Sequence, residues 1–155
     1  MKRSEFLALA AAAPLALVAG CGSTAAQQSA VKHKVAIVAK STSTEFWKSV
    51  FAGAETAATE YNLTLTIDGP ETEEDYETQN RMVAKAVEDG AEVIVFSAID
   101  FEANVAAIEA AVAAGVRVVT IDSGVDSDKV STYIGTDNYA AGCMAAQAAL
   151  SCGYE

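Results

Sequence analysis

Short apolar runs alternate along this chain with longer segments in which apolar residues recur at every third or fourth position. The short runs are rich in β-branched residues and too brief for stable helices, so they predict β-strands. Residues 35–39 and 93–96 are continuously apolar, which is typical of parallel strands that are buried on both faces. Residues 63–67 instead alternate between apolar and polar side chains, which indicates a strand near the edge of the sheet. The expected strands are Val35–Ala39, Leu63–Ile67, Glu92–Phe96, Val116–Ile121 and Ser131–Ile134.

The longer segments have the period of amphipathic helices. We expect helices from Phe46 to Tyr61, from about Glu73 to Asp89, from a cap at Asp100 to Gly115, and over about Tyr139–Ser151. Glycines after the second and third helices act as stop signals. The aromatic residues predicted to face inward include Phe46, Trp47 and Tyr61 in the first helix, Tyr76 in the second and Phe101 in the third.

The alternation of strands and helices predicts an α/β fold. Right-handed crossovers place helices on both faces of such a sheet, so we expect a doubly wound, Rossmann-like parallel sheet of about five strands. The expected strand order is 2-1-3-4-5. In that order the loops Ser41–Glu45 and Ser97–Asp100 face each other at the switch point between strands one and three, where open α/β sheets bind ligands.

The first 20 residues do not follow this pattern and have the features of an export signal. Two basic residues precede Phe6–Ala19, an apolar run that is too short to span a bilayer comfortably. The run ends in Val-Ala-Gly-Cys, which resembles the lipobox of bacterial lipoproteins, whose Cys becomes the lipid-bearing first residue. We therefore expect residues 1–20 to be a lipoprotein signal peptide, Cys21 to be lipidated and residues 21–33 to form a flexible tether.

The acidic charge of the chain narrows its possible partners. The formal net charge is −11, and it would become more negative without the signal, because Lys2, Arg3 and Glu5 leave together. Such a charge disfavours binding to nucleic acid or to anionic lipid headgroups. We therefore expect acyl chains, and not charge, to hold the protein at a membrane.

The Cys and His residues predict neither a metal site nor a structural disulfide. No pair of them has the spacing of metal ligands, and the single histidine, His33, lies in the predicted tether. Cys143 and Cys152 fall on one predicted helix at a separation of about 13 Å, which is too far for a disulfide bond. We expect no metal and no cofactor.

Three groups of residues are predicted to converge at the carboxyl edge of the sheet. They are Phe46 and Trp47 at the start of the first helix, Ser97 and Asp100 after the third strand, and Asp122 and Ser123 after the fourth. Aromatic rings pack against the C–H faces of a sugar, and carboxylates accept hydrogen bonds from its hydroxyl groups. A sugar is therefore the expected ligand.

Each of these groups also has a purely structural interpretation. Neighbouring helical residues point about 100° apart, so one of Phe46 and Trp47 should belong to the core. Asp100 fits a helix cap, and Asp122 fits a turn. Likewise, residues 137–138, Asp-Asn, fit the cap of the last helix.

Common enzyme motifs are absent from the sequence. It has no G-x-G-x-x-G after the first strand, no G-x-x-x-x-G-K-[ST], no G-x-S-x-G and no histidine near a Ser or Cys. We therefore expect a binding protein without catalytic residues. A secreted flavodoxin-like carrier or enzyme remains the alternative, because it shares the topology. In addition, the Ser-Thr-Ser-Thr run at residues 41–44, which precedes a helix, partly resembles a phosphate-binding loop.

Three segments carry a resemblance to a known family. They are VAIVAKSTSTEFWKSVFAGA, VIVFSAIDFEANVAAI and VVTIDSGVDSDKVSTYIGTDNYAAG. Together they resemble the periplasmic binding proteins of ABC sugar importers, of the ribose- and galactose-binding type, over about Lys34–Gly153. The resemblance implies that Phe46 and Trp47 are sugar platforms preceded by the polar Thr44, and that Asp122 accepts sugar hydroxyls. Ser97 stands where the family often has Asn, and Ser123 where it frequently has Arg.

The resemblance also implies a division of the chain. Residues 34–136 would form the amino-terminal lobe of a two-lobed protein, Thr136, Asp137 and Asn138 its hinge, and residues 137–155 the hinge region with the first helix of a second lobe. The family encloses its ligands between lobes, so we expect this chain alone to bind sugar weakly or not at all. The implied function is that of a lipid-anchored, extracytoplasmic solute-binding protein that docks on an ABC permease. A non-functional fragment is the further alternative.

Overall fold

A computed structural model describes residues 32–154 of the chain. Its five strands form one sheet in which all neighbouring strands are parallel, in the order β2-β1-β3-β4-β5. The strands are β1 Lys34–Val38, β2 Thr64–Asp68, β3 Val93–Phe96, β4 Arg117–Ile121 and β5 Thr132–Ile134. The predicted α/β class, the doubly wound parallel sheet and the strand order are confirmed.

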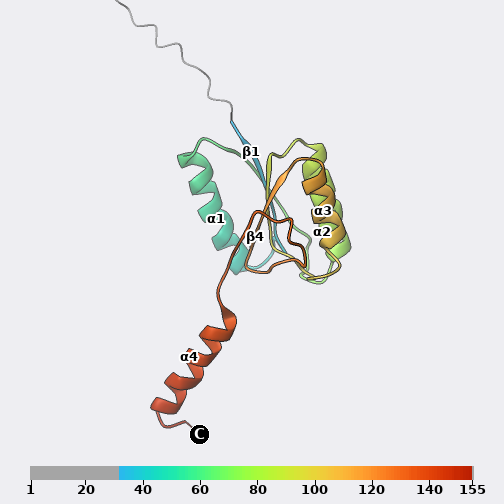
Figure 1. The fold of residues 1–155 in the computed structure, drawn as a ribbon. Coiled ribbons are helices and arrows are strands. Elements are labelled where there is room, and N and C mark those ends of the chain that lie inside the picture. Colours follow the sequence, from blue (N-terminus) through green and yellow to red (C-terminus); the bar gives the residue numbers. More distant parts are fainter. Residues whose placement is uncertain (1–31, 155) are drawn as a thin grey trace, which may run out of the picture. The chain divides into compact units, whose positions relative to one another are not determined.

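Helices cover both faces of the sheet. Those in the described residues are α1 Glu45–Glu60, α2 Tyr76–Glu88, α3 Val105–Ala113 and α4 Asn138–Ser151. Helix α1 packs on one face, and α2 and α3 pack side by side on the other (Figure 1). Because β1 pairs with both β2 and β3, the crossovers leave β1 and β3 in opposite directions, which places the switch point between these two strands.

Alternate residues of β1 and the residue that follows it enter two different hydrophobic cores. Ala36 and Val38 belong to the larger core, between the sheet and helices α2 and α3, whereas Ile37 and Ala39 belong to the smaller core beneath α1. The completely buried apolar residues of the larger core are Ile94, Phe96, Ile108 and Val118. Burial of a side chain of this size contributes about 1.5–3 kcal/mol, so this core supplies much of the stability.

Polar side chains fix where the helices begin. Thr44 Oγ1 accepts a hydrogen bond from the backbone N–H of Trp47 at 3.4 Å, and Asp75 Oδ1 accepts one from that of Thr78 at 2.9 Å. The Thr78 hydroxyl and backbone N–H together hold the pKa of the Asp75 carboxyl below its usual value. The cap at Asp75 makes α2 begin at Tyr76, later than the predicted start near Glu73.

Four of the aromatic residues predicted to face inward are exposed instead. The exposed fractions are 57% for Phe46, 68% for Tyr61, 38% for Tyr76 and 56% for Phe101. Each lies at the boundary of an element, where the inward face of the helix is not continued. Tyr61 follows the last residue of α1, for example, and Phe101 lies in the turn that precedes α3.

The prediction that Asp100 caps the third helix is wrong. Its Oδ1 atom accepts hydrogen bonds from the backbone N–H groups of Glu102 at 2.9 Å and Ala103 at 2.7 Å, which closes a turn over residues 101–104. Helix α3 begins only at Val105, and the side chain of Asn104 before it makes no cap hydrogen bond.

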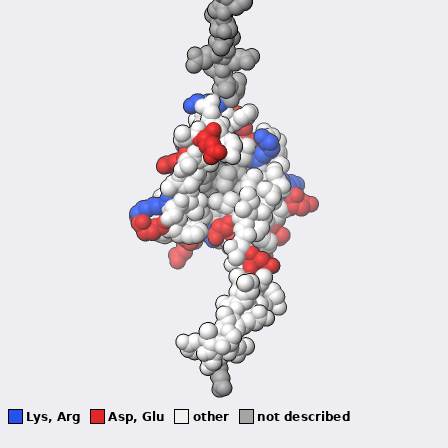
Figure 2. Space-filling view, turned by 90° about the vertical axis from the view of Figure 1, so that its left-hand side faces the viewer, with Lys and Arg blue, Asp and Glu red and all other residues white. Residues whose placement is uncertain are grey.

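Helix α4 differs from the other helices because none of its residues is buried. It contains no Lys, Arg, Asp or Glu and is therefore white in Figure 2. Cys143 in this helix and Cys152 after it are both exposed free thiols.

The predicted signal peptide, Cys21 and nearly all of the predicted tether lie outside the described residues. Across residues 32–154, no helix combines the length and the apolar character that a bilayer span requires. The predicted lipid anchor therefore stays a prediction.

One buried amide side chain joins α2 to the ends of two strands. Gln79 is completely buried, and its Nε2 atom donates hydrogen bonds to the carbonyl oxygens of Ala39 at 2.9 Å and Ser97 at 2.8 Å. Its Oε1 atom accepts a hydrogen bond from the backbone N–H of Ile99 at 3.1 Å. These backbone groups lie in the loops after β1 and β3, so a single side chain satisfies polar groups on both sides of the switch point.

Replacement of Gln79 by Ala should destabilise the protein by about 3 kcal/mol, because it leaves buried carbonyl and N–H groups without partners. Chemical denaturation followed by circular dichroism measures this loss. Gln147→Ala, on the exposed surface of α4, is the matched control and should change the free energy of unfolding by less than about 0.5 kcal/mol. Equal midpoints for the two variants would show that the Gln79 bonds do not stabilise the fold.

Candidate functional site

The loops after β1, β3 and β4 meet at the carboxyl edge of the sheet. Val38 pairs with Phe96, and Phe96 pairs with Thr120, so these three neighbouring parallel strands end at nearly the same level. The residues that follow each strand therefore lie beside one another. This edge contains most of the residues predicted from the sequence to bind a ligand.

Asp122 lies at the centre of this edge. The donors to its Oδ2 atom are Lys40 Nζ at 3.0 Å, Ser97 Oγ at 3.3 Å and Ser123 Oγ at 3.3 Å. They come from the loops after β1, β3 and β4. Among the described residues, no donor contacts the Oδ1 atom, and the Asp122 side chain is 41% exposed. The structure thus brings Ser97, Asp122 and Ser123 together, as predicted.

The backbone of Asp122 adopts an unusual conformation. Its φ is +58°, in the left-handed region, which Asp tolerates better than most residues. The Tyr133 hydroxyl donates a hydrogen bond to the Asp122 carbonyl oxygen at 2.9 Å, and the Asp122 N–H donates to the Ile134 carbonyl oxygen at 3.0 Å. Strand β5 therefore holds this residue in place.

Lys40 belongs to the site, although the sequence analysis did not single it out. It is the second residue after β1, its side chain is 19% exposed, and its ammonium group forms the ion pair with Asp122. A signal was present in the sequence: Lys40 is an ionisable side chain at the end of an apolar strand, at the predicted switch point. The sequence could not show that its partner is Asp122, which follows another strand, β4.

The aromatic pair divides into one exposed ring and one buried ring. Phe46 is 57% exposed and Trp47 is 1% exposed, with the ring centroids 5.1 Å apart in an edge-to-face arrangement. The Trp47 Nε1 atom donates a hydrogen bond to Glu73 Oε1 at 2.9 Å, and the indole stacks on Phe51. In this conformation Trp47 is a core residue that supports Phe46, and of the two rings only that of Phe46 is exposed.

Serine hydroxyl groups join the loop after β1 to the loop after β2. Ser41 Oγ and Ser43 Oγ lie 2.9 Å apart, and each donates a hydrogen bond to the Glu71 carbonyl oxygen at 3.2 Å. A Cβ atom at Gly69 would lie 3.1 Å from the Ala39 carbonyl oxygen, so glycine allows the two loops to approach closely. Thr44, the predicted polar residue before the aromatic pair, is the cap of α1.

The side chains of Asn104 and Asn80 hold the loop after β3 in place through hydrogen bonds. Asn104 is completely buried, and its Oδ1 atom accepts a hydrogen bond from the Asp100 N–H at 2.9 Å. Its Nδ2 atom donates to Asn80 Oδ1 at 2.7 Å, and Asn80 donates in turn to the Ala103 carbonyl oxygen at 3.1 Å. Asp100 is thus engaged in its own turn, which accounts for this carboxylate without a ligand.

The predicted hinge residues Thr136 and Asp137 lie between β5 and α4, and Asn138 is the first residue of α4; all three are exposed. Asp137 Oδ1 accepts a hydrogen bond from the Ala140 N–H at 2.9 Å and caps α4. The cap accounts for the carboxylate at position 137 without a ligand. The role of these residues as a hinge stays a prediction.

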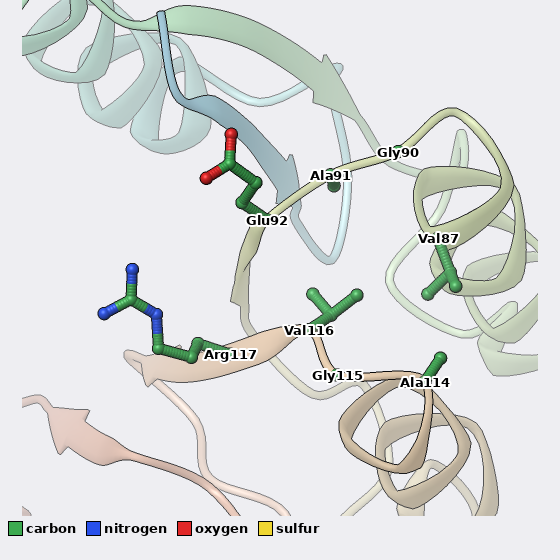
Figure 3. Close-up of a pocket in the computed structure, with 8 residues that line it drawn as sticks. All are labelled: Val87, Gly90, Ala91, Glu92, Ala114, Gly115, Val116 and Arg117. Carbon is green, nitrogen blue, oxygen red and sulfur yellow. The ribbon is translucent and has the colours of Figure 1, made fainter. Parts of the chain in front are cut away.

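A hollow of about 380 Å³ lies at the opposite, amino edge of the sheet (Figure 3). It is bordered by the ends of α2 and α3 and by the starts of β3 and β4, with Glu92 and Arg117 at one side and Val87, Ala114 and Val116 at the other. His33 Nδ1 lies 2.7 Å from Glu92 Oε2, and this contact holds the pKa of Glu92 below its usual value. Glu92 is engaged by His33 and by the Lys34 N–H, whereas donors from three different loops meet on one carboxylate at the carboxyl edge, so that edge is the better candidate site.

The carboxyl edge combines acceptor oxygens, an ammonium group and an exposed phenyl ring. This combination suits a ligand with hydroxyl groups and apolar C–H faces. Within residues 32–154, no three His, Cys, Asp or Glu side chains are grouped so that they could hold a metal ion.

Curated proteins with similar sequences are named for sugar binding. The ribose import binding protein of Bacillus subtilis is 32% identical over 101 residues, which are 65% of this chain and 32% of that protein. The D-ribose/D-allose-binding protein of Pseudomonas aeruginosa is 29% identical over 115 residues, which are 69% of this chain and 36% of that protein. The chain therefore spans about a third of the length of these relatives.

A solved structure shows the same fold. A carbohydrate transporter solute binding protein from Agrobacterium radiobacter, in complex with D-arabinose, matches with a TM-score of 0.71 and 30% identity. The match covers 76% of this chain and 40% of that one.

A family model described as the periplasmic binding protein domain matches residues 35–153, which is most of the chain. This is a family of binding proteins, so the resemblance inferred from the sequence is confirmed, as is the expectation that the chain is not an enzyme. The chain belongs to the periplasmic binding protein domain family.

Proposed function

We propose that this chain binds a monosaccharide-like ligand at the carboxyl edge of its sheet. Asp122 is the principal acceptor for ligand hydroxyl groups, and Phe46 offers the exposed ring. Ser97 and Ser123 orient the carboxylate. The observation that carries the proposal is the Asp122 side chain, in which three donors from three loops hold Oδ2 while Oδ1 faces no protein donor among the described residues.

The comparisons support a sugar as the class of ligand. The matched relatives are named for ribose and allose, and the matched structure contains D-arabinose. Pentoses and hexoses have the hydroxyl groups and C–H faces that a carboxylate and a phenyl ring can bind. The exposed phenyl ring favours this function over the flavodoxin-like alternative. So does the engagement of the Ser41 and Ser43 hydroxyl groups with each other and with the Glu71 carbonyl oxygen on the loop after β2.

We further propose that the chain acts as the solute-binding component of an ABC sugar importer. The family name indicates an extracytoplasmic place of action, and the apolar amino-terminal run followed by Cys21 supports a lipid anchor. In this role the protein passes its ligand to a permease without chemistry. Residues 136–138 would form the first crossing of a hinge to a second lobe.

Replacement of Asp122 by Asn should weaken the binding of D-ribose and D-arabinose by about tenfold to a hundredfold, because a charged hydrogen-bond acceptor is lost. NMR titration of the full chain in detergent measures even weak binding. Asp128→Asn, an exposed carboxylate on the loop before β5, is the matched control and should bind like the wild type. Sugar-dependent shifts around the amino-edge hollow, and not around residues 97 and 122, would overturn the proposed site.

The chain alone should bind its sugar more weakly than a protein that carries both lobes. Its candidate site lies open at one edge of a sheet, and ligand sites gain affinity by burying most of the ligand surface. Calorimetry on the chain and on a two-lobed version tests this expectation. Equally tight binding by both proteins would show that the second lobe adds nothing to affinity.

Replacement of Cys21 by Ser should release the protein from the membrane fraction, because the thiol that would receive the lipid is absent. Fractionation of bacteria that express the wild type and the variant, followed by immunoblotting, measures the distribution. Cys143→Ser is the matched control and should remain with the membrane. Retention of Cys21→Ser at wild-type levels would contradict lipidation at this residue.

A further inference from the structure

The loop after β3 supports the loop after β4 through backbone hydrogen bonds. The Ala98 N–H donates to the Ser123 carbonyl oxygen at 3.3 Å, and the Asp126 N–H donates to the Phe101 carbonyl oxygen at 2.9 Å. The first of these bonds holds the residue next to Asp122. The conformation of the loop after β3 therefore helps to determine where the carboxylate proposed to bind the ligand lies.

Two asparagine side chains hold the loop after β3 in turn. Asn104 Oδ1 accepts a hydrogen bond from the Asp100 N–H at 2.9 Å, and Asn104 Nδ2 donates one to Asn80 Oδ1 at 2.7 Å. Asn80 Nδ2 donates to the Ala103 carbonyl oxygen at 3.1 Å. The pair thus anchors the backbone at positions 100 and 103, on both sides of Phe101, and ties this part of the loop to helix α2.

Asn104 bonds to the loop and not to its own helix. It is the N-cap residue of α3, where an Asn side chain usually accepts a hydrogen bond from a backbone N–H of the first helical turn. Here it makes no such bond. The residue is completely buried, so its amide group needs partners, and it finds them in Asp100 and Asn80. The usual helix cap is therefore replaced by bonds that order the loop.

We propose that Asn80 and Asn104 are positioning residues of the candidate site. They keep the loop after β3 in the conformation in which its backbone holds the loop that carries Asp122 and Ser123. The proposal rests on the proposed function, in which Asp122 accepts ligand hydroxyl groups. Because Asn104 is completely buried, the pair acts through the backbone of these loops and not by contact with the ligand.

The same two side chains have an alternative, purely structural role, which is to stabilise the domain as a whole. The two roles predict different patterns of amide hydrogen exchange. A general loss of stability accelerates exchange by global unfolding throughout the protein. The loss of a local anchor instead accelerates exchange in the loops after β3 and β4, while the central strands stay protected.

Replacement of Asn80 by Asp separates these roles with little change in side-chain size. The new carboxylate can still accept the hydrogen bond from Asn104, but it cannot donate one to the Ala103 carbonyl oxygen. The variant therefore removes a single anchor of the loop. NMR hydrogen exchange on the full chain in detergent, without ligand, measures the consequence.

The N–H groups of Ala98 and Asp126 should exchange about tenfold faster in Asn80→Asp than in the wild type. Those in the central strands β3 and β4 should keep their wild-type rates. The affinity for D-ribose, measured by NMR titration, should fall about threefold to tenfold, because Asp122 is held less firmly. Asn62→Asp, the same change at an exposed residue beyond the end of α1, is the matched control and should alter neither quantity.

A second variant guards against an effect of the added charge. Asn80→Ala removes the anchor without a carboxylate and should show the same selective exchange and the same loss of affinity. Equal acceleration in the loops and the central strands, unchanged exchange at Ala98 and Asp126, or unchanged ribose affinity would overturn the inference and leave the proposed function standing. Absence of ribose-dependent shifts in the wild type would instead overturn the proposed function.

Discussion

The parallel pairing of β1 with β3 is the constraint on which the rest of this structure depends. It places the ends of two strands side by side while their crossovers go to opposite faces, so that no helix of either crossover covers the edge between them. The carbonyl oxygens that follow these strands would otherwise be buried without partners. Gln79 satisfies those of Ala39 and Ser97 from helix α2, which keeps the two loops at a fixed separation.

That fixed separation makes the electrostatics of the candidate site possible. Lys40 comes from one of the two loops, Ser97 from the other, and both reach Asp122 on a third. A carboxylate that is held on one oxygen has its second oxygen oriented before any ligand arrives. Such preorganisation reduces the entropy lost on binding, and it requires a rigid sheet beneath the loops.

The fold could be predicted from the sequence because its signals are local and repeated. Short β-branched runs between helical periods fix the number of strands, and the handedness of crossovers restricts their order. Element boundaries were less predictable, because the period of a helix does not reveal where its inward face stops. In the sequence, Phe101 and Tyr61 fit the helical spacing of apolar residues. In the structure, both lie beyond the helix ends and are exposed.

The site could be predicted only in part, for a related reason. The position of Asp122 at the end of a strand was visible in the sequence, and the topology then brought Ser97 to it. The partnership with Lys40 depends on which side-chain atoms meet across two strands, which no local pattern encodes. Asp100 shows the opposite error, since a carboxylate at the right edge proved to be engaged in a turn of its own.

The edge strand β5 belongs to the site even though all of its residues are exposed. Asp122 holds a left-handed backbone conformation that costs about 1 kcal/mol, and Tyr133 offsets this cost by donating its hydroxyl to the Asp122 carbonyl oxygen. Gly135 permits this placement, because a Cβ atom there would lie 2.0 Å from the Tyr133 hydroxyl oxygen. Any larger residue at position 135 must displace the Tyr133 ring and remove the hydrogen bond that orients Asp122. The conformation of Asp122, the carboxylate proposed to bind the ligand, therefore depends in part on Gly135, which links the segment leading to the predicted hinge with the candidate site.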